Sequence, residues 1–265
     1  MPVFAVHASG EFLAKAQVLA RRYGFTVEEG IPAAGRRHDQ TAPTAYLALT
    51  DEGLTFCDPE NRLTMRVDYL RGAAAYRLFA VGNSCEPLLA AMGLNKGALK
   101  QKLAAGETPY ILDAGAGLGR DGLVMAAAGA RVLMCERSPV MAALLEDGLA
   151  RAAEDEKRGA TIRERLELHF GDAREVLAAR GKEFSSVYFD PMFPERTKTA
   201  LVKKEMRLAR RISGDDTDAA EILALARTVT PQVVVKRPLH AEPLSADVHR
   251  VVKGTRVRYD IYCGL

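Results

Sequence analysis

The sequence has no run of about eighteen apolar residues, the length that a membrane-spanning helix needs. Its first residues, Met1 to His7, lack both the basic start and the long apolar stretch of a secretory signal peptide. We therefore expect no membrane segment and no signal peptide. The hydrophobic share of 48% over 265 residues is still enough for a substantial core, in one large domain or a large domain with a small appendage.

Cysteine is also scarce, and metal ligands are not grouped. The four cysteines are scattered without a Cys-x-x-Cys pair, which argues against a disulfide framework or a zinc site and for free thiols in a reducing cytoplasm. The five histidines show no metal-ligand spacing either, so we expect no bound metal. The net charge of +3 does not by itself indicate a nucleic-acid partner, so the places where cations gather carry more information.

The pattern of apolar residues divides the chain into three parts. Residues 1–70 predict a small α+β cap domain, residues 71–109 a polar and partly basic connector, and residues 110–265 a larger domain. A structural lid without chemistry is an alternative interpretation of the cap. In the first two parts we expect strands at 3–7, 46–50, 54–57 and 63–68, a helix at 11–23 that Gly24 stops, a polar loop at 30–44, a helix at 88–92 and a turn at 93–97.

Strands and helices alternate in the third part, which is typical of an α/β, Rossmann-like fold with a doubly wound sheet. The expected helices lie at 118–128, from Pro139 onward behind a Ser138 cap, and at 174–179. The last two strands form a hairpin, so the sheet is mixed. The seven expected strands lie at 110–113, 131–135, 166–170, 187–189, 233–235, 248–252 and 257–262.

The first of these strands ends in Asp113 and is followed by a loop with glycine at every second position, including Gly115 and Gly117. Glycine lets a ligand lie close to the backbone, and the helix behind the loop offers unpaired N–H groups. The dinucleotide-binding pattern Gly-x-Gly-x-x-Gly is not met, because the third glycine comes one residue early. The carboxylates of Asp113 and Asp121 suit a cationic or zwitterionic ligand better than a pyrophosphate.

The next strand ends in Glu136, where an acid can accept both hydroxyls of a ribose. The glycine loop, the acids beside it and this ribose acceptor together favour S-adenosylmethionine over an ordinary strand-turn-helix. Asp172, at the end of the third strand, suits the exocyclic amine of an adenine, and capping of the following helix is an equal alternative. Because ligands of such sheets bind at the carboxyl ends of the strands, these acids are expected to share one site.

The fourth strand leads into Asp190-Pro191-Met192-Phe193-Pro194. The two prolines stiffen a platform on which a planar base can stack on Phe193, while its amino group donates to the Asp190 carboxylate and the Pro191 carbonyl. Acceptors for both N–H groups aim the nitrogen lone pair at a methyl group, and Asp190 can take the proton. The alternative is an Asp-Pro turn without chemistry.

A basic stretch follows this motif. The segment 199–212 has an apolar stripe at helical spacing, with cations on another face that suit a phosphate backbone. A solvated charged helix is the alternative. The cations in or near this segment are Arg196, Lys198, Lys203, Lys204, Arg207, Arg210 and Arg211, and Lys236 and Arg237 at the end of the fifth strand add two on the same edge.

These motifs resemble the bacterial small-subunit ribosomal RNA guanine-N2 methyltransferases of the J type. The resemblance runs from about Val67 to the C-terminus. It rests on Asp113-Ala-Gly-Ala-Gly-Leu-Gly-Arg-Asp121, Cys135-Glu-Arg-Ser-Pro-Val140, Leu144-Leu-Glu-Asp-Gly-Leu-Ala-Arg151, Asp190-Pro-Met-Phe-Pro194, Leu201-Val-Lys-Lys-Glu-Met-Arg207, Val233-Val-Val-Lys-Arg-Pro238 and Tyr259-Asp-Ile-Tyr262. The uninterrupted stretch 200–207 is much more specific than the glycine loop.

The resemblance implies a class I methyltransferase fold and a guanosine near the 3′ end of 16S ribosomal RNA, in the small ribosomal subunit, as substrate. It also implies cofactor contacts at Arg120 and Asp121, at Glu136 and Arg137, at the pair Asp172 and Ala173, and at Asp190.

Three other functions stay open at this point. One is a methyltransferase for another amine, such as adenine or a small molecule, which the Asp-Pro-x-Phe motif does not distinguish. Another is a non-catalytic RNA-binding or assembly factor that keeps the cofactor fold. A nicotinamide dehydrogenase is disfavoured by the glycine spacing.

Overall fold

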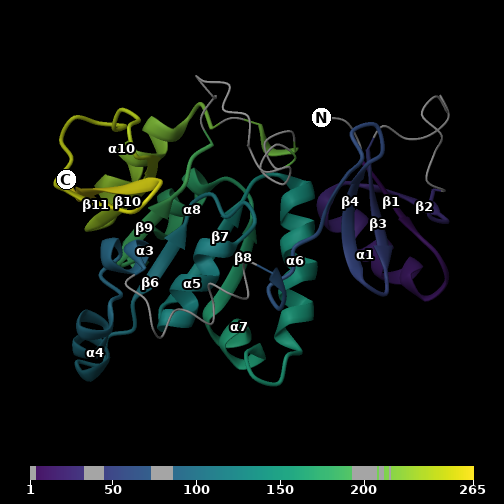
Figure 1. The fold of residues 1–265 in the computed structure, drawn as a ribbon, viewed down its shortest axis with the longest axis horizontal. Helices are drawn as coiled ribbons and strands as arrows, with labels where there is room; N and C mark the ends of the chain where they lie inside the picture. Colours follow the sequence, from purple (N-terminus) through teal and green to yellow (C-terminus); the bar gives the residue numbers. More distant parts are fainter. Residues whose placement is uncertain (1–3, 33–44, 73–85, 193–207, 209–211, 215) are drawn as a thin grey trace.

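The structure is a computed structural model that describes residues 4–32, 45–72, 86–192, 208, 212–214 and 216–265. It contains two β-sheets, a small one near the N-terminus and a larger one with helices on both faces, and helix α6 lies between them (Figure 1). The sequence motifs lie at the ends of strands that belong to the larger sheet.

The small sheet has the strand order β2-β1-β3-β4-β5, with β1 parallel to both of its neighbours. Helix α1 ends where the sequence predicts, because Gly24 takes a left-handed conformation with φ 74°. Strand β2 was not predicted, since it is an edge strand with no buried residue and no alternation. The elements are β1 (Ala5–Ala8), η1 (Gly10–Phe12), α1 (Leu13–Tyr23), β2 (Thr26–Glu29), β3 (Tyr46–Thr50), β4 (Gly53–Asp58) and β5 (Leu63–Met65).

The larger sheet has seven strands in the order β11-β12-β10-β9-β6-β7-β8, and β12 runs antiparallel to both neighbours. This is the mixed seven-stranded sheet that the sequence predicts, including its terminal hairpin. The elements from the connector to the second strand of this sheet are α3 (Pro87–Ala91), α4 (Lys96–Ala104), β6 (Tyr110–Asp113), α5 (Arg120–Ala128) and β7 (Arg131–Glu136). Those that follow are α6 (Pro139–Ala153), α7 (Gly159–Arg165), β8 (Leu166–Phe170), α8 (Ala173–Arg180), η2 (Gly181–Glu183), β9 (Ser186–Phe189), α10 (Ala219–Val229), β10 (Gln232–Pro238), β11 (Arg250–Lys253) and β12 (Val257–Cys263).

Each central strand buries both of its faces, as a parallel strand between two helical layers must. Side chains alternate between the faces, so Tyr188 and Val234 join the core under α5 and α6, whereas Val187 and Val235 join the core under α8 and α10. The same alternation fixes which polar residues at the strand ends share a face.

Three helices were missed or cut short by the sequence reasoning. The expected turn at 93–97 gives way to α4 at Lys96, because the Asn95 side chain accepts a hydrogen bond from the Ala98 amide and caps the helix. Helix α4 buries only Leu99, and α7 buries only Gly159 and Ile162, so neither has a clear apolar stripe. No helix was expected where α10 lies.

The small sheet is fastened to α6 by buried polar contacts. Asp147 of α6 is 2% exposed, and it accepts hydrogen bonds from Lys15 Nζ, the Leu54 amide and Arg151 Nε, each at 2.8 or 2.9 Å. These donors outweigh the effect of burial and lower the pKa of Asp147. The domain boundary near residue 70 stays a prediction, since one hydrophobic core continues from the small sheet into the larger one.

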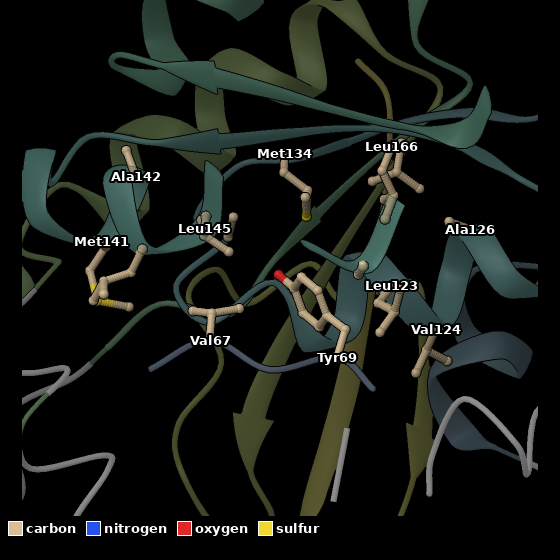
Figure 2. Close-up of a cluster of buried hydrophobic side chains, with 14 of the residues drawn as sticks. Val67, Tyr69, Leu123, Val124, Ala126, Met134, Met141, Ala142, Leu145 and Leu166 are labelled. Carbon is tan, nitrogen blue, oxygen red and sulfur yellow. The ribbon is translucent and has the colours of Figure 1, made fainter. Parts of the chain in front are cut away.

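The segment after the small sheet also packs against the glycine loop. Tyr69 lies among side chains of α5 and α6, with Leu123 on one side and Leu145 on the other (Figure 2). Its hydroxyl donates to the Leu118 carbonyl at 3.2 Å. At Gly119, where φ is 64°, an added Cβ would overlap the Tyr69 hydroxyl and Leu145. Only glycine therefore fits this turn, and Tyr69 sets its position.

Candidate active site

A cavity of about 310 Å³ lies where the order of the larger sheet reverses, between β6 and its neighbours β7 and β9. In open α/β sheets, ligands generally bind at this point, outside the carboxyl ends of the strands. The structure brings four of the expected acids to this cavity, although they end four different strands: Asp113, Glu136, Asp172 and Asp190. The expected residues Gly115, Gly117, Arg120, Asp121, Arg137 and Ala173 line it as well.

Asp113 is 1% exposed, and its Oδ1 has no hydrogen-bond partner among the described residues. Burial, followed by the nearby charge of Asp121, raises the pKa of Asp113 well above its ordinary value, and the Gly115 amide opposes this shift. A buried carboxylate with an unused oxygen favours a cation or a hydrogen-bond donor beside it. Within the glycine loop, a Cβ on Gly115 would be tight against the Phe189 ring at 3.2 Å, whereas Gly117 is open, with nothing within 4 Å of an added Cβ.

Among the described residues, it is backbone amides that donate hydrogen bonds to the Glu136 carboxylate. Its Oε2 accepts from the Gly117 amide at 2.9 Å and its Oε1 from the Ser138 amide at 2.8 Å. Burial raises the pKa of Glu136 to about 7, with the two amides opposing the shift. Because each carboxylate oxygen can accept a second hydrogen bond, the group remains able to take two hydroxyls on the cavity side.

A charged cluster forms the opposite wall of the cavity. Lys236 Nζ lies 2.8 Å from Asp121 Oδ2 and 2.7 Å from Asp190 Oδ2. The Tyr188 hydroxyl donates to Asp121 Oδ2 at 2.6 Å. Burial opposes the charge on Lys236, but Asp190 and Asp121 outweigh it and raise the pKa of the ammonium above its ordinary value. Limited hydration raises the pKa of Asp190, and Lys236 counteracts the rise.

Asp216 links the two walls. Its Oδ1 accepts a hydrogen bond from the Arg137 guanidinium at 2.6 Å, and its Oδ2 accepts one from the Met192 amide at 2.8 Å. The amide of Asp216 in turn donates to the Met192 carbonyl at 2.9 Å. Arg137 also pairs with Asp218 at 2.7 Å. The turn after Asp190 is therefore pinned to the strand that ends in Glu136.

Asp172 caps helix α8, one of the two alternatives that the sequence left open. Its Oδ1 accepts from the Arg174 amide at 2.8 Å, and the Arg174 guanidinium lies 2.6 Å from Oδ2. These hydrogen bonds lower the pKa of Asp172. Asp172 also borders the cavity, so the adenine contact stays a prediction.

The placement of Lys236 and Arg237 corrects the sequence interpretation, which put both on a basic, phosphate-facing edge. Adjacent residues of a strand point to opposite faces. Lys236 points into the cavity toward Asp190, and Arg237 is 7% exposed and donates to the Glu242 carbonyl on the other face. The buried Arg237 does not present its charge to a phosphate backbone, whereas an RNA contact of Lys236 stays a prediction.

Several expected residues lie outside the described part of the chain. These are Phe193 of the acceptor platform and the cations Arg196, Lys198, Lys203, Lys204, Arg207, Arg210 and Arg211. Pro191 is described and is buried directly after Asp190. The roles of all these residues stay predictions.

Sequence reasoning missed the supporting residues of the cavity. Tyr188 could have been found, because it lies two positions before Asp190 and so faces the same side of the strand. Asp216 and the inward role of Lys236 had no local pattern, since each depends on which strands are neighbours.

The described residues contain neither a candidate metal-binding cluster nor a candidate membrane-spanning helix. No group of three or more histidine, cysteine, aspartate or glutamate residues there has an arrangement that could hold a metal ion. None of the described helices combines the length and the apolar character needed to cross a membrane.

Residues 33–264 match a protein family described as "Putative SAM-dependent methyltransferase". The ribosomal RNA small subunit methyltransferase J of Thioalkalivibrio sulfidiphilus is 39% identical over 97% of this chain and 95% of its own length. The protein of the same name from Shewanella sediminis is 44% identical over 74% of this chain and 73% of its own. A solved SAM-dependent methyltransferase from Neisseria gonorrhoeae has a similar fold, with a TM-score of 0.69 and 26% identity over 97% of this chain and 95% of its own.

Proposed function

The chain belongs to the family of the SAM-dependent ribosomal RNA small subunit methyltransferases J, and from this membership we propose that it methylates the exocyclic N2 amine of a guanosine near the 3′ end of 16S ribosomal RNA. The observation that carries the proposal is the cavity itself. In it, the glycine loop and Glu136, the acid that can accept ribose hydroxyls, face the end of the neighbouring strand β9, which leads into Asp190 and Pro191.

The cavity residues fit S-adenosylmethionine. Asp113 has an unused buried oxygen for a cationic group, and the Glu136 carboxylate retains acceptor capacity for two ribose hydroxyls. Gly117, with φ 53°, leaves the backbone of the loop accessible, since an added Cβ there would meet nothing within 4 Å. The cofactor supplies a methyl group bonded to a positively charged sulfur.

Asp190 is the group that meets the guanine amine. With one oxygen on Lys236, it keeps the other to accept an N–H of the base, and the Pro191 carbonyl is the expected second acceptor. The nitrogen lone pair would then take the methyl group, and the electron pair of the broken S–C bond would stay with the cofactor's sulfur. Asp190 takes the proton that the nitrogen loses. The target base must leave its stack to reach this position.

The RNA backbone is expected along the same edge of the sheet. The cations of the stretch 196–211 follow Asp190 directly in the chain. In the sheet, the register Pro238↔Val257 puts the tip of the β11–β12 hairpin at the carboxyl end of β10, with Lys253 and Arg256 exposed there. Positive charge at this tip, and in the sequence that follows Asp190, suits a strand of phosphates. An enzyme acting on this RNA works in the cytoplasm, where ribosomes assemble.

The first test offers methyl-labelled S-adenosylmethionine and purified protein to ribosomal RNA from cells that lack the enzyme, both as naked RNA and as small subunits. We expect label on guanine N2 at a single 16S position, and the better substrate identifies the assembly stage. Label on adenine or on a small molecule would replace the proposed substrate, whereas cofactor binding without transfer would favour a non-catalytic assembly factor.

A second test concerns the basic stretch. Reversing Lys203, Arg207 and Arg210 to glutamate is expected to weaken RNA binding and to reduce its salt dependence, with little change in cofactor affinity. Each lost phosphate contact should reduce the slope of log K against log salt by roughly 0.7 to 0.9. An unchanged slope would mean that the stretch is only a solvated face.

A further inference from the structure

Lys236 lies at the centre of the charged cluster that it forms with Asp121 and Asp190, here called the acceptor wall. The proposed function uses only its contact with one oxygen of Asp190. Lys236 Nζ lies 2.7 Å from Asp190 Oδ2 and 2.8 Å from Asp121 Oδ2. Its side chain is 21% exposed, so the ammonium is largely withdrawn from water. An ammonium in this position is stabilised by the two carboxylates, and it holds both of them in place.

The backbone fixes this meeting of charges. Strand β10 pairs with β9 in parallel up to Val235↔Phe189, so Lys236 and Asp190 follow the last paired residues of two neighbouring strands. The alternation of side chains turns Lys236 to the face that α5 covers. Asp121 stands there in the first turn of α5. The ion pair is therefore set by the sheet register and does not depend on a flexible loop.

Asp121 is itself anchored by the strand that carries Asp190. The Tyr188 hydroxyl donates to Asp121 Oδ2 at 2.6 Å, and Tyr188 precedes Asp190 by two residues on the same face. Tyr188, Asp121, Lys236 and Asp190 thus form a chain of three contacts that begins and ends on one strand. A displacement of the Lys236 ammonium would have to break two ion pairs.

The surroundings of Lys236 are strongly acidic. Burial raises the pKa of Asp113, and limited hydration raises that of Asp190. Without a cation, like charges would push the Asp190 carboxyl further toward its protonated form, which cannot accept a proton. The titratable groups that face the pair from the elements around it are Asp113 of β6, Asp121 of α5, Tyr188 of β9, Tyr259 of β12 and Asp216 before α10.

We propose that Lys236 is a positioning residue for methyl transfer: its ammonium, braced by Asp121, fixes Oδ2 of Asp190 so that Oδ1 faces the substrate amine. The inference rests on the proposed function, because it takes Asp190 as the group that meets the amine. Among the described residues, Lys236 is the side chain that hydrogen-bonds the Asp190 carboxylate. The carboxylate thus keeps one orientation and remains a base.

The central variant is Lys236→Met, which keeps the length of the side chain and removes its charge. We expect kcat to fall by roughly 100-fold, as for a displaced acid–base group. The acid limb of the pH–rate profile should move to higher pH, because Asp190 loses its stabilising cation. The KM for RNA and its salt dependence should stay unchanged, and the Kd for S-adenosylmethionine should change by less than roughly threefold.

Lys236→Arg should restore the pH profile, since it returns the positive charge, even if its larger fork recovers only part of kcat. Lys182→Met is the matched control. Lys182 is exposed in η2, just before β9 begins and so at the opposite edge of the sheet from Asp190. It should match the wild type in every parameter. Asp121→Asn, which removes one brace of Lys236, should give a smaller loss of kcat.

A second readout does not depend on activity. The carboxyl carbon of Asp190, labelled with 13C and assigned with an Asp190→Asn variant, is titrated by NMR in wild type and in Lys236→Met. We expect a higher midpoint in the variant. If Lys236→Met fails to fold, Lys236→Gln, which also removes the charge, carries the same comparison.

Three outcomes are decisive. An unmoved NMR midpoint and pH profile would overturn the inference. A weaker RNA affinity with a smaller salt slope, at unchanged kcat, would overturn it as well and make Lys236 a phosphate contact. If the wild type transfers no methyl group to any RNA, the proposed function fails, but the NMR titration still shows whether Lys236 controls Asp190.

Discussion

The two walls of the cavity hold their carboxylates in different ways. The wall that contains Asp113 and Glu136 is here called the cofactor wall. There, the Glu136 carboxylate accepts hydrogen bonds from the amides of Gly117 and Ser138, and the Asp113 carboxylate accepts one from the amide of Gly115. On the acceptor wall, Asp190 is held by Lys236, a side chain 46 positions away in the sequence. Backbone donors hold one wall, and a charged side chain holds the other.

This difference has a chemical reason. Backbone amides are neutral and fixed, so they orient an acid that only has to bind a ligand, and they leave its pKa governed by burial. An acid that accepts a proton must stay ionised beside other carboxylates, and a paired ammonium achieves this. The variants below distinguish the two walls, because damage to the cofactor wall should weaken cofactor binding and damage to the acceptor wall should slow turnover.

The largest effect is expected from Asp190→Ala. The variant loses the acceptor of the amine N–H and of the proton, so turnover should fall at least roughly 1000-fold. Cofactor binding should remain measurable by calorimetry, because Asp113 and Glu136 are untouched. Turnover close to that of the wild type would remove Asp190 from the chemistry.

Glu136→Gln should break the cofactor wall instead. A glutamine places an NH2 group against the Gly117 or Ser138 amide and loses one acceptor, so the Kd for S-adenosylmethionine should rise by roughly 10- to 100-fold. Turnover at saturating cofactor should change much less. Glu175→Gln, at an exposed position of α8, is the control and should leave the Kd unchanged.

The same position predicts a pH dependence. The pKa of Glu136 is raised to about 7, and the ionised form accepts the ribose hydroxyls. Cofactor affinity of the wild type should therefore rise between pH 6 and pH 8, whereas Glu136→Gln should lack this rise. A pH-independent Kd in the wild type would show that Glu136 does not titrate in this range.

The contrast between the walls also explains what the sequence could predict. The cofactor wall is local, since Asp113 and its glycines lie within one strand-turn-helix, and Glu136 lies at the end of the next strand. Such patterns are visible in a sequence because the interacting residues are close neighbours. The strands at 46–50 and 166–170 were predicted to the residue for a similar reason, with turn residues marking their ends.

The acceptor wall could be predicted only in part. Asp190 and Pro191 were visible as a motif, but Tyr188 pairs with Asp121 across 67 positions. That contact and the ion pairs of Lys236 follow from the strand order β10-β9-β6, which no local pattern contains. Lys236 and Arg237 were placed on one edge because strand alternation was not applied to them. Helices α4 and α7 were missed because they bury few residues.

Asp216→Asn tests the link between the walls. The amide can still accept from Met192 or Arg137, but one of the two contacts is lost or weakened together with the charge. We expect roughly a tenfold loss of kcat and a smaller rise in cofactor Kd, because the turn after Asp190 loosens. Asp247→Asn, at an exposed ion pair with Arg227, should leave both parameters unchanged. A rise in the cofactor Kd at unchanged kcat would mean that Asp216 supports the cofactor wall alone.

The smallest effect is expected at Asp172, where the cofactor wall meets helix α8. Asp172→Ala removes the cap on the Arg174 amide and should cost about 1 kcal/mol, or roughly 2 to 4 °C in Tm. The exposed pair with Arg174 should add little, because water screens it. Asp172→Asn keeps a capping oxygen and should retain the Tm of the wild type. If capping is the whole role of Asp172, cofactor affinity changes by less than roughly threefold in both variants. A tenfold weaker affinity in Asp172→Ala, beyond what its Tm explains, would instead establish the adenine contact and extend the cofactor wall by a side chain that points at the ligand.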